Sequence, residues 1–395
     1  MTASEPLRIV RIIARLNIGG PAIQAITLTK ELEPRGYRTT LVRGKEGPDE
    51  GNMDHLADAL GVRPVLVPWM RRNPDPGDVL ALLALIRILR REQPQIVHTH
   101  AAMGGTLGRV ATLIAFPRKR TRPLLIHTYH GHSLTGYFSA RRAEAYRRIE
   151  QILARQTDRL IAVADEVRDE LVALGVAPAH QFAVVPLGFD LSPFTVNGAV
   201  RERSREALRV ELGVPPDSRV VTLIARLVPV KRVDRFLRLA VALRDIPGVR
   251  FLIVGDGELR DRLQQSAEAR ALQDRLIWAG FRHDMPAVYF ASDVVVQTSD
   301  NEGTPVSLIE AQAAGVPVVS TRVGGTASTV GDARQLASVD DERGLARAAQ
   351  ALLQDRKLAA VSATAGRHRV LASFDLARLV SDVDALYKES LGSYR

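Results

Sequence analysis

The chain has 395 residues, of which 46% are hydrophobic and 25% charged, and its formal net charge is +10. This is an ordinary globular composition, and the length exceeds what one core usually supports, so two domains are expected. The absence of cysteine excludes disulfides and thiolate metal sites, which fits a reducing compartment.

The N-terminal segment, Met1 to Pro6, has no basic region followed by an apolar core, so no secretory signal is expected. The longest apolar run, Val79 to Leu89, is interrupted by Arg87 and has roughly half the length needed to span a bilayer. We therefore expect a cytoplasmic protein.

Strand and helix patterns alternate from the start. Leu7 to Leu16 is strand-like, a loop with Gly19 and Gly20 follows, and Ala22 to Leu32 is amphipathic. Glycines at this point suit a tight turn or a close approach of the backbone to a ligand. The loop lacks G-x-G-x-x-G, which argues against a nicotinamide cofactor.

Further strands are predicted near 39–42, 65–67, 96–99, 124–129, 159–163 and 182–185. Helical patterns between most of them predict right-handed crossovers and a mainly parallel sheet. A first α/β domain is therefore expected over residues 1–188.

Histidines stand at the ends of two of these strands. The first group is His98 and His100, and the second is His127, His130 and His132. A zinc site is one interpretation, but no carboxylate or cysteine stands at ligand spacing, so no metal is expected. For His98, a hydrogen-bonded histidine near the core is the alternative.

The segment 109–148 holds nine basic residues against one acid, Glu144. Few aromatic residues and no recognisable motif accompany it, so nucleic acid is not expected as a partner. We expect contact with an anionic membrane surface or a lipid diphosphate, with a solvated face as the alternative.

A turn-rich stretch from Pro186 to about Arg201 reads as the linker to a second domain over 189–374. There, the strand Val220–Ile224 precedes Arg226 and Lys231, which together could neutralise a diphosphate. Two such residues alone are usually surface charge.

Two glycine-bearing turns follow later strands of the second domain. Phe251–Val254 leads into Gly255 and Gly257, and another strand ends at Gly280 and Phe281. Asp256 with Glu258 is not a convincing metal site.

The stretch 299–325 predicts a strand end, a loop with Glu302 and Gly303, and a helix from about Thr304 to Ala314. Pro305 suits the first turn of that helix and Gly315 the position past its end. Amides of Gly303, Thr304 and Val306 could donate to a ligand at the helix start. A final helix is predicted over 375–391.

Glu302, seven intervening residues and Glu310, followed by Ala-Gln-Ala-Ala-Gly-Val-Pro-Val-Val, resemble the E-x7-E signature of GT4 retaining glycosyltransferases. A solvated helix face would explain the two glutamates alone. The surrounding residues, and the Arg-x4-Lys of Arg226 and Lys231, strengthen the resemblance, which covers nearly the whole chain and extends to bacterial surface-polysaccharide enzymes.

The resemblance implies a GT-B fold, which is an α/β fold of two Rossmann-like domains whose parallel sheets face each other across a cleft. The last helix, about 375–395, would pack back on the first domain. The implied activity moves a hexose or N-acetylhexosamine from a nucleotide diphosphate sugar, commonly UDP-linked, to a lipid-linked or saccharide acceptor, with retained configuration and no metal or other cofactor.

The resemblance also assigns roles to individual residues. Catalytic roles fall to His130, Arg226, Lys231 and Glu302. Donor-binding roles fall to Gly19, Gly20, Gly255, Gly257, Gly280, Phe281, Gly303, Thr304, Pro305, Val306 and Glu310. Acceptor-side roles fall to His100, Arg109, His132 and Tyr137.

Two other functions remain open from the sequence. A nucleotide-sugar 2-epimerase shares the two-domain architecture, and a non-catalytic protein could bind a nucleotide sugar without turnover. The donor sugar, the base, the acceptor and the oligomeric state have no signature in the sequence.

Overall fold

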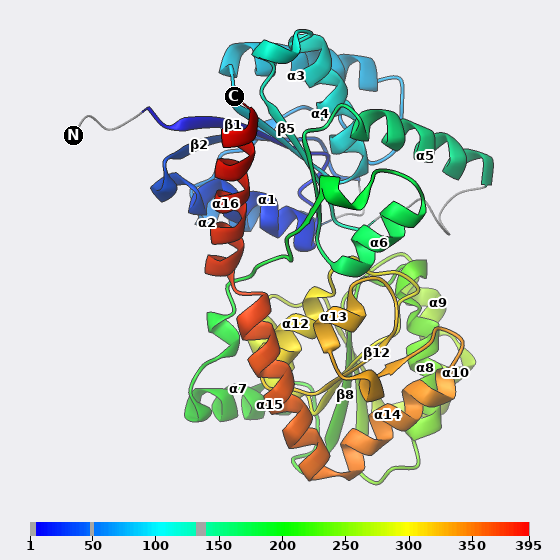
Figure 1. Ribbon diagram of the computed structural model, residues 1–395. Helices are drawn as coiled ribbons and strands as arrows, with labels where there is room; N and C mark the ends of the chain where they lie inside the picture. The colour runs from blue at the N-terminus through cyan, green and yellow to red at the C-terminus, as the bar shows by residue number, and fades with distance from the viewer. Residues whose placement is uncertain (1–4, 48–50, 132–139, 395) are drawn as a thin grey trace. The chain divides into compact units, whose positions relative to one another are not determined.

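The computed structural model describes residues 5–47, 51–131 and 140–394, and the chain divides into two compact units (Figure 1). Unit 1 comprises Met1–Phe189 together with Leu376–Arg395, and unit 2 comprises Asp190–Asp375. The chain therefore leaves unit 1 once and returns to it with its last helix.

Unit 1 is built on a seven-stranded sheet with the order β3-β2-β1-β4-β5-β6-β7, in which all neighbouring strands are parallel. The strands are β1 (Leu7–Ile13), β2 (Tyr37–Arg43), β3 (Val65–Leu66), β4 (Ile96–His100), β5 (Leu124–Tyr129), β6 (Arg159–Ala162) and β7 (Phe182–Val184). The helices are α1 (Gly20–Glu31), α2 (Asp54–Ala59), α3 (Asp78–Glu92), α4 (Ala102–Ala115), α5 (Ala140–Ala154), α6 (Asp165–Ala173) and α16 (Leu376–Tyr394). The predicted parallel α/β architecture is confirmed.

Alternate residues of β1 serve opposite faces of this sheet, as the two-residue period of a strand requires. Val10 and Ile12 belong to the core that includes α3 and α4. Ile9 belongs to the core on the other face, together with Leu379 and Tyr387 of α16. The last helix thus supplies part of the hydrophobic core of unit 1.

Unit 2 repeats the architecture with a six-stranded parallel sheet of order β10-β9-β8-β11-β12-β13. The strands are β8 (Arg219–Ile224), β9 (Val249–Val254), β10 (Leu276–Gly280), β11 (Val294–Gln297), β12 (Val318–Thr321) and β13 (Leu336–Ala337). The helices are α7 (Gly198–Glu211), α8 (Val233–Leu243), α9 (Arg260–Gln264), α10 (Ala267–Leu272), α11 (Met285–Ala291), α12 (Val306–Ala313), α13 (Thr326–Val330), α14 (Glu342–Gln354) and α15 (Arg356–Ser373). One core lies between this sheet and α8, α10 and α14, and a second involves α7 and α11.

Within the described part of the chain, no helix combines the length and the apolar character that a bilayer crossing requires.

Candidate functional site

The predicted cationic and acidic residues of unit 2 lie at the carboxyl edge of its sheet. The segment after β8 carries Arg226 and Lys231, and the loop after β11 carries Glu302. Strands β8 and β11 are parallel neighbours, with Val294 paired to Val221. Their ends therefore meet at one edge, where open α/β sheets bind ligands.

Lys231 and Glu302 are in direct contact. The ammonium of Lys231 donates to Oε1 of Glu302 at 2.5 Å, and the hydroxyl of Ser299 donates to the same oxygen at 2.5 Å. The side chain of Glu302 is 9% exposed and that of Lys231 is 22% exposed. A carboxylate held by two donors, with its other oxygen uncommitted to them, can still accept a hydroxyl hydrogen bond from a ligand.

Arg226 lies in the same segment but is exposed. Among the described residues, its guanidinium has no hydrogen bond or ion pair, so its donors are available to a ligand. The structure thus brings Lys231 and Glu302 together. The side chain of Arg226, which lies in the same segment as Lys231, pairs with neither of them.

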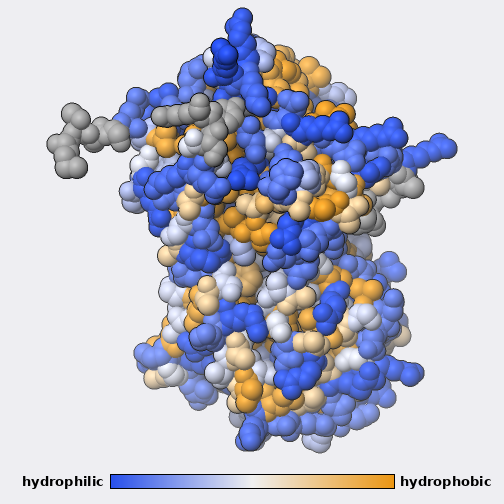
Figure 2. All heavy atoms as spheres, viewed as in Figure 1, coloured by the Kyte–Doolittle hydropathy of each residue, from blue (hydrophilic) through white to orange (hydrophobic). Residues whose placement is uncertain are grey.

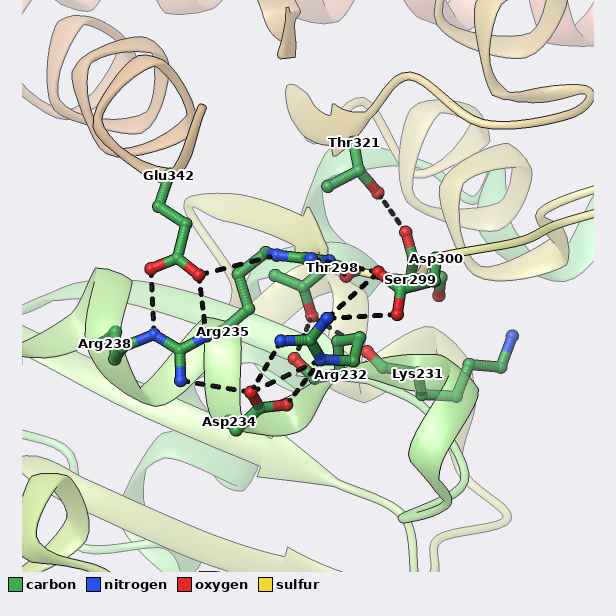
Figure 3. Close-up of polar contacts among 10 residues, drawn as sticks. All are labelled: Lys231, Arg232, Asp234, Arg235, Arg238, Thr298, Ser299, Asp300, Thr321 and Glu342. Carbon is green, nitrogen blue, oxygen red and sulfur yellow. Dashed lines mark hydrogen bonds and ion pairs between the residues drawn. The ribbon is translucent and has the colours of Figure 1, made fainter. Parts of the chain in front are cut away.

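The Lys231 turn and the Glu302 loop are tied together by a polar network (Figure 3). Asp300 pairs with Arg235 at 2.9 Å and with Arg232 at 3.1 Å. Arg235 also donates to the carbonyl of Thr298, whose hydroxyl donates at 3.0 Å to the carbonyls of Lys231 and Arg232. The two loops are therefore held in one arrangement by hydrogen bonds, of which those of Arg235 and Thr298 are buried or half-buried.

The network continues away from the loops through Asp234, Arg238 and Glu342 (Figure 3). Burial opposes ionisation of Asp234, but hydrogen bonds from Arg232 and Arg238 lower its pKa to about 2. Asp234 thus remains charged across the physiological range and helps to fix Arg232.

Glu310 lies in the second turn of α12, where Oη of Tyr289 donates to its Oε2 at 2.7 Å. Burial raises the pKa of Glu310 to about 7, and the Tyr289 hydrogen bond opposes that rise. The ring of Tyr289 packs edge-on against Phe194 with centroids 5.6 Å apart. Glu310 is consequently poised between its neutral and charged forms near neutral pH.

Helix α12 begins later than expected, at Val306 instead of Thr304. Pro305 is the residue before the helix, with φ −80° and ψ 87°, so the prediction that it occupies the first helical turn is wrong. Gly303 and Thr304 belong to the preceding loop, and the hydroxyl of Thr304 is buried without a partner among the described residues. Gly315 does follow the helix in the left-handed region, with φ +71°.

Gly255 and Gly257 lie against the segment that carries Arg226. Both have positive φ, of +130° and +156°, and a Cβ on Gly257 would come within 2.7 Å of the Leu227 carbonyl oxygen. A Cβ on Gly255 would collide with the carbonyl of Ala225. These glycines therefore have a packing role, and their donor-binding role remains a prediction, as do those of Gly280 and of Phe281, whose side chain is 49% exposed.

In unit 1, histidines gather where β4 and β5 end. Nδ1 of His100 and Nε2 of His130 lie 3.1 Å apart and share a hydrogen bond. Burial lowers the pKa of His130 to about 3 and the pKa of His100 well below its usual value. Both imidazoles are therefore neutral at neutral pH, and Nδ1 of His130 is buried without a partner among the described residues.

His98 has a structural role, in keeping with the core alternative. Its ring nitrogens contact Oη of Tyr387 at 2.5 Å and Oγ1 of Thr128 at 2.7 Å. Within the described ranges, no group of three or more His, Asp or Glu residues is arranged to hold a metal ion.

Arg109 does not fit its expected acceptor-side role. It is fully buried, and its guanidinium donates to both oxygens of Glu150, at 2.9 and 2.8 Å. Tyr129 donates to the same carboxylate at 2.7 Å. Both bonds come from Nη2, and Nη1 is buried without a partner among the described residues. Because Arg109 is fully buried and paired inside unit 1, it contributes nothing to a basic surface.

Four predicted residues of unit 1 remain. Gly19 precedes α1 with φ +152°, and Gly20 is its first residue. His132 and Tyr137 lie outside the described residues, so their predicted roles stay predictions.

Sequence reasoning missed Ser299, Tyr289 and Asp300. Ser299 could have been suspected because it precedes Glu302 by three residues in the same loop. Tyr289 has no local signal, since its hydrogen bond to Glu310 joins α11 to α12 across 21 residues. The pairing of Asp300 with Arg235 could not be predicted because the two residues are 65 positions apart in the sequence.

Comparison with known proteins is consistent with this geometry. Residues 204–369 match the family described as glycosyl transferases group 1, and residues 18–193 match glycosyltransferase family 4. A solved structure of HepE from Anabaena, in complex with UDP and glucose, superimposes with a TM-score of 0.79 over 98% of this chain and all of its own, at 20% identity. Sucrose-phosphate synthase from Thermosynechococcus elongatus gives a TM-score of 0.79 at 21% identity, with coverages of 98% and 100%. The fold is GT-B, and the class is that of the glycosyltransferases.

Curated relatives extend along nearly the whole chain. UDP-Gal:alpha-D-GlcNAc-diphosphoundecaprenol alpha-1,3-galactosyltransferase of Escherichia coli is 30% identical over 92% of this chain and 93% of its own length. D-inositol 3-phosphate glycosyltransferase of Mycolicibacterium smegmatis is 29% identical over 95% and 88%. The chain belongs to glycosyltransferase family 4, also called group 1.

Proposed function

We propose that this glycosyltransferase moves a hexose or N-acetylhexosamine from a UDP-sugar to a lipid-linked or saccharide acceptor, with retained configuration and without a metal. The observation that carries the proposal is the Lys231–Glu302 pair at the carboxyl edge of the unit 2 sheet, with Arg226 in the same segment. A cation at this edge of the sheet can stabilise a departing nucleotide diphosphate, and an acid beside it can accept hydrogen bonds from the sugar hydroxyls.

UDP is the proposed nucleotide because two independent names point to it. The Escherichia coli relative is named for UDP-Gal, and the Anabaena neighbour was solved with UDP-glucose at 21% identity. The E. coli relative is also named for a diphosphoundecaprenol acceptor, which supports a lipid-linked acceptor here and a role in bacterial polysaccharide or glycoconjugate synthesis.

In the proposed reaction, the anomeric carbon gains positive character as the diphosphate leaves with negative charge. Arg226, Lys231 and the amides at the start of α12 would stabilise the leaving group through preorganised donors. Glu302 would accept hydrogen bonds from the sugar hydroxyls, and Glu310 from those of the ribose. Attack would come from the face that the diphosphate leaves. Loss of Arg226 or Lys231 is then expected to lower the rate by about a hundredfold.

His130 is proposed to contact the transferred sugar. Because its imidazole is neutral, it can donate from one nitrogen while accepting at the other, which suits a hydroxyl partner. Its Nδ1, which has no hydrogen-bond partner among the residues that the structure describes, is the atom proposed for such a contact.

The acceptor proposal includes peripheral contact with an anionic membrane at its cytoplasmic face. The described part of the 109–148 region keeps Arg118, Lys119 and Arg120 exposed. On α3 of the same unit, Val79, Leu80 and Leu83 are 64%, 47% and 48% exposed, and Figure 2 shows hydrophobic residues gathered over this helix. Exposed basic residues follow on α3 at Arg87, Arg90 and Arg91. An apolar face with flanking arginines fits the interface of an anionic bilayer.

The testing experiment is a thermal-shift screen against UDP, ADP, GDP and their sugar conjugates, followed by transfer assays with and without EDTA. UDP is expected to stabilise the wild-type protein but not the Arg226→Ala variant, and EDTA is expected to leave transfer unchanged. Abolition of transfer by EDTA would overturn the metal-free mechanism. Conversion of the donor without transfer to any acceptor would instead indicate a 2-epimerase.

A further inference from the structure

A polar cavity of about 610 Å³ lies at the edge of the unit 1 sheet where the strands begin. Its walls come from the segments that precede the neighbouring strands β5, β6 and β7. The lining residues that bear on its chemistry are Lys119, Arg122, Arg155, Asp158, Arg159 and Gln181. His100 and His130 stand at the other end of the strands, about 20 Å away for a six-residue strand. The cavity is therefore separate from the proposed transfer chemistry.

The charge of this cavity is strongly unbalanced. Lys119, Arg122, Arg155 and Arg159 line it, against the single acid Asp158. Arg159 pairs at 2.9 Å with Glu389 of α16. The side chains of the other three basic residues form no hydrogen bond or ion pair with any residue that the structure describes.

Arg122 is the most informative of the three because it is buried. It is only 9% exposed, and its Nε lies buried without a hydrogen-bond partner in the described part of the chain. Buried polar groups in proteins are nearly always paired, with protein, water or a ligand. Because the guanidinium of Arg122 lines the cavity and its buried Nε is unpaired, an acceptor inside the cavity would satisfy it.

Hydrogen-bond acceptors of the same region already receive hydrogen bonds from within the protein. The carboxylate of Asp158 accepts from the Leu125 amide at 2.8 Å, and burial raises its pKa, which weakens its tendency to ionise. The side-chain amide of Gln181 donates to the carbonyls of Ala154 and Thr157, at 2.6 and 2.8 Å, where α5 ends. The acceptors thus turn inward. Asp158 interacts with Arg122 and Lys119 through longer-range electrostatics, but the side chains of Lys119, Arg122 and Arg155 have no hydrogen bond or ion pair with the described residues.

We propose that this cavity binds a phosphate-class anion, either a free diphosphate or the phosphate of a lipid headgroup. Planar guanidinium forks match phosphate oxygens in pairs, and a lysine adds a compact charge. The proposal concerns a second anion site on this transferase, independent of the donor site of unit 2.

The first experiment titrates inorganic pyrophosphate by calorimetry into an Arg226→Ala/Lys231→Ala background, which removes the proposed diphosphate clamp of unit 2. In that background, Lys119→Gln/Arg155→Gln removes two exposed cavity cations. The matched control, Arg118→Gln/Arg120→Gln, removes two exposed cations of the same segment that do not line the cavity. Binding is expected to weaken about tenfold or more in the cavity variant and to stay within about twofold in the control.

If both variants lose the same pyrophosphate affinity, the binding comes from diffuse surface charge and the proposal is overturned. Absence of pyrophosphate binding in the clamp-free background would overturn it as well. Arg122→Gln gives a further check, with an expected loss at least as large as that of the double variant. Far-UV circular dichroism establishes that each variant is folded, and the exposed pair keeps the test decisive if Arg122→Gln is not.

A flotation assay distinguishes the two sources of phosphate. Vesicles of phosphatidylcholine with phosphatidylglycerol are compared with pure phosphatidylcholine. If the site takes lipid headgroups, pyrophosphate competes with flotation of the wild-type protein and has no effect on flotation of the cavity variant. If it takes a free diphosphate, pyrophosphate leaves flotation of the wild-type protein unchanged, while the cavity variant still loses pyrophosphate binding.

Discussion

Glu310 is the residue whose titration has the clearest consequence. Its pKa of about 7 in the folded protein exceeds its ordinary 4.5, so the unfolded chain loses this proton at lower pH. Stability from this group is therefore complete below about pH 4.5 and is lost as the pH rises through 7. We expect the free energy of unfolding of Glu310→Gln at pH 8, measured by denaturant titration, to exceed that of the wild type by about 1–3 kcal/mol. At pH 5 the difference should be much smaller. A variant less stable than wild type at pH 8 would contradict the assignment.

Tyr289→Phe tests the partner of the same carboxyl. The Tyr289 hydrogen bond favours the charged form of Glu310, so its removal should raise the pKa of that acid further. We expect UDP affinity, measured by calorimetry between pH 6 and 9, to reach its high-pH plateau at a higher pH than in the wild type. The loss in folding free energy should be about 1 kcal/mol. An unshifted pH profile would show that Tyr289 does not act through Glu310.

Several residue roles could not be predicted because their partners are distant in sequence. Arg109 reads as a surface cation until α5 brings Glu150 against it, 41 residues later. His98 meets Tyr387 across 289 residues. Lys231 and Glu302 were easier, since each lies in the segment that follows an apolar strand and the carboxyl ends of parallel strands share an edge. For Lys231 and Glu302, the family resemblance and the order of the strands were enough to predict a shared sheet edge. The partners of Arg109 and His98 depend on tertiary packing.

At the scale of elements, the loop between β11 and α12 depends on Asp300. Asp300→Asn removes the charge that faces Arg232 and Arg235, and the latter is only 4% exposed as a side chain. We expect a loss of about 1–2 kcal/mol in stability and a roughly tenfold rise in the donor KM, because Glu302 is no longer held beside Lys231. Asp234→Asn is the matched control, since it pairs with Arg232 and Arg238 but not with the loop. Equal effects of the two variants on KM would refute a positioning role.

Helix α3 makes a second prediction at this scale. Leu80→Ser/Leu83→Ser should weaken flotation with anionic vesicles by about tenfold, because each exposed leucine would bury apolar surface in the bilayer. The melting temperature should change little, since both side chains are about half exposed. Val210→Ser/Val361→Ser, which changes two exposed valines of unit 2, is the control. Unaltered flotation of the α3 variant would remove this helix from the membrane proposal.

The element boundaries show where pattern reading succeeds and where it fails. Apolar runs separated by helical periods predicted the parallel sheets, because buried strands need continuous hydrophobic residues. The start of α12 was misplaced because Pro305 suits both the first helical turn and the residue before it. Its backbone geometry, with ψ 87°, follows from the surrounding loop and has no sequence signature.

For the whole molecule, the return of the chain to unit 1 predicts that removal of the last helix affects the stability of the two units unequally. Leu379, Val383 and Tyr387 are at most 1% exposed and belong to the core of unit 1. Deletion of residues 376–395 should therefore destabilise unit 1 by several kcal/mol and leave unit 2 intact. Scanning calorimetry should show two transitions, one for unit 1 at a lower temperature than in the full chain and one for unit 2 at an unchanged temperature. Residues 190–375 expressed alone should match the unchanged transition, and a single lowered transition would contradict the independence of unit 2.

The same connectivity has a consequence during translation. Unit 2 is an insertion between β7 and α16, so a ribosome delivers all of its residues before the helix that completes the core of unit 1. Unit 2 can fold as it emerges, whereas the hydrophobic face that receives α16 stays uncovered until α16 has been made. Chaperones that bind nascent chains should therefore protect the half that is made first, and a premature stop after residue 375 should leave a chain with one finished domain and one exposed sheet face.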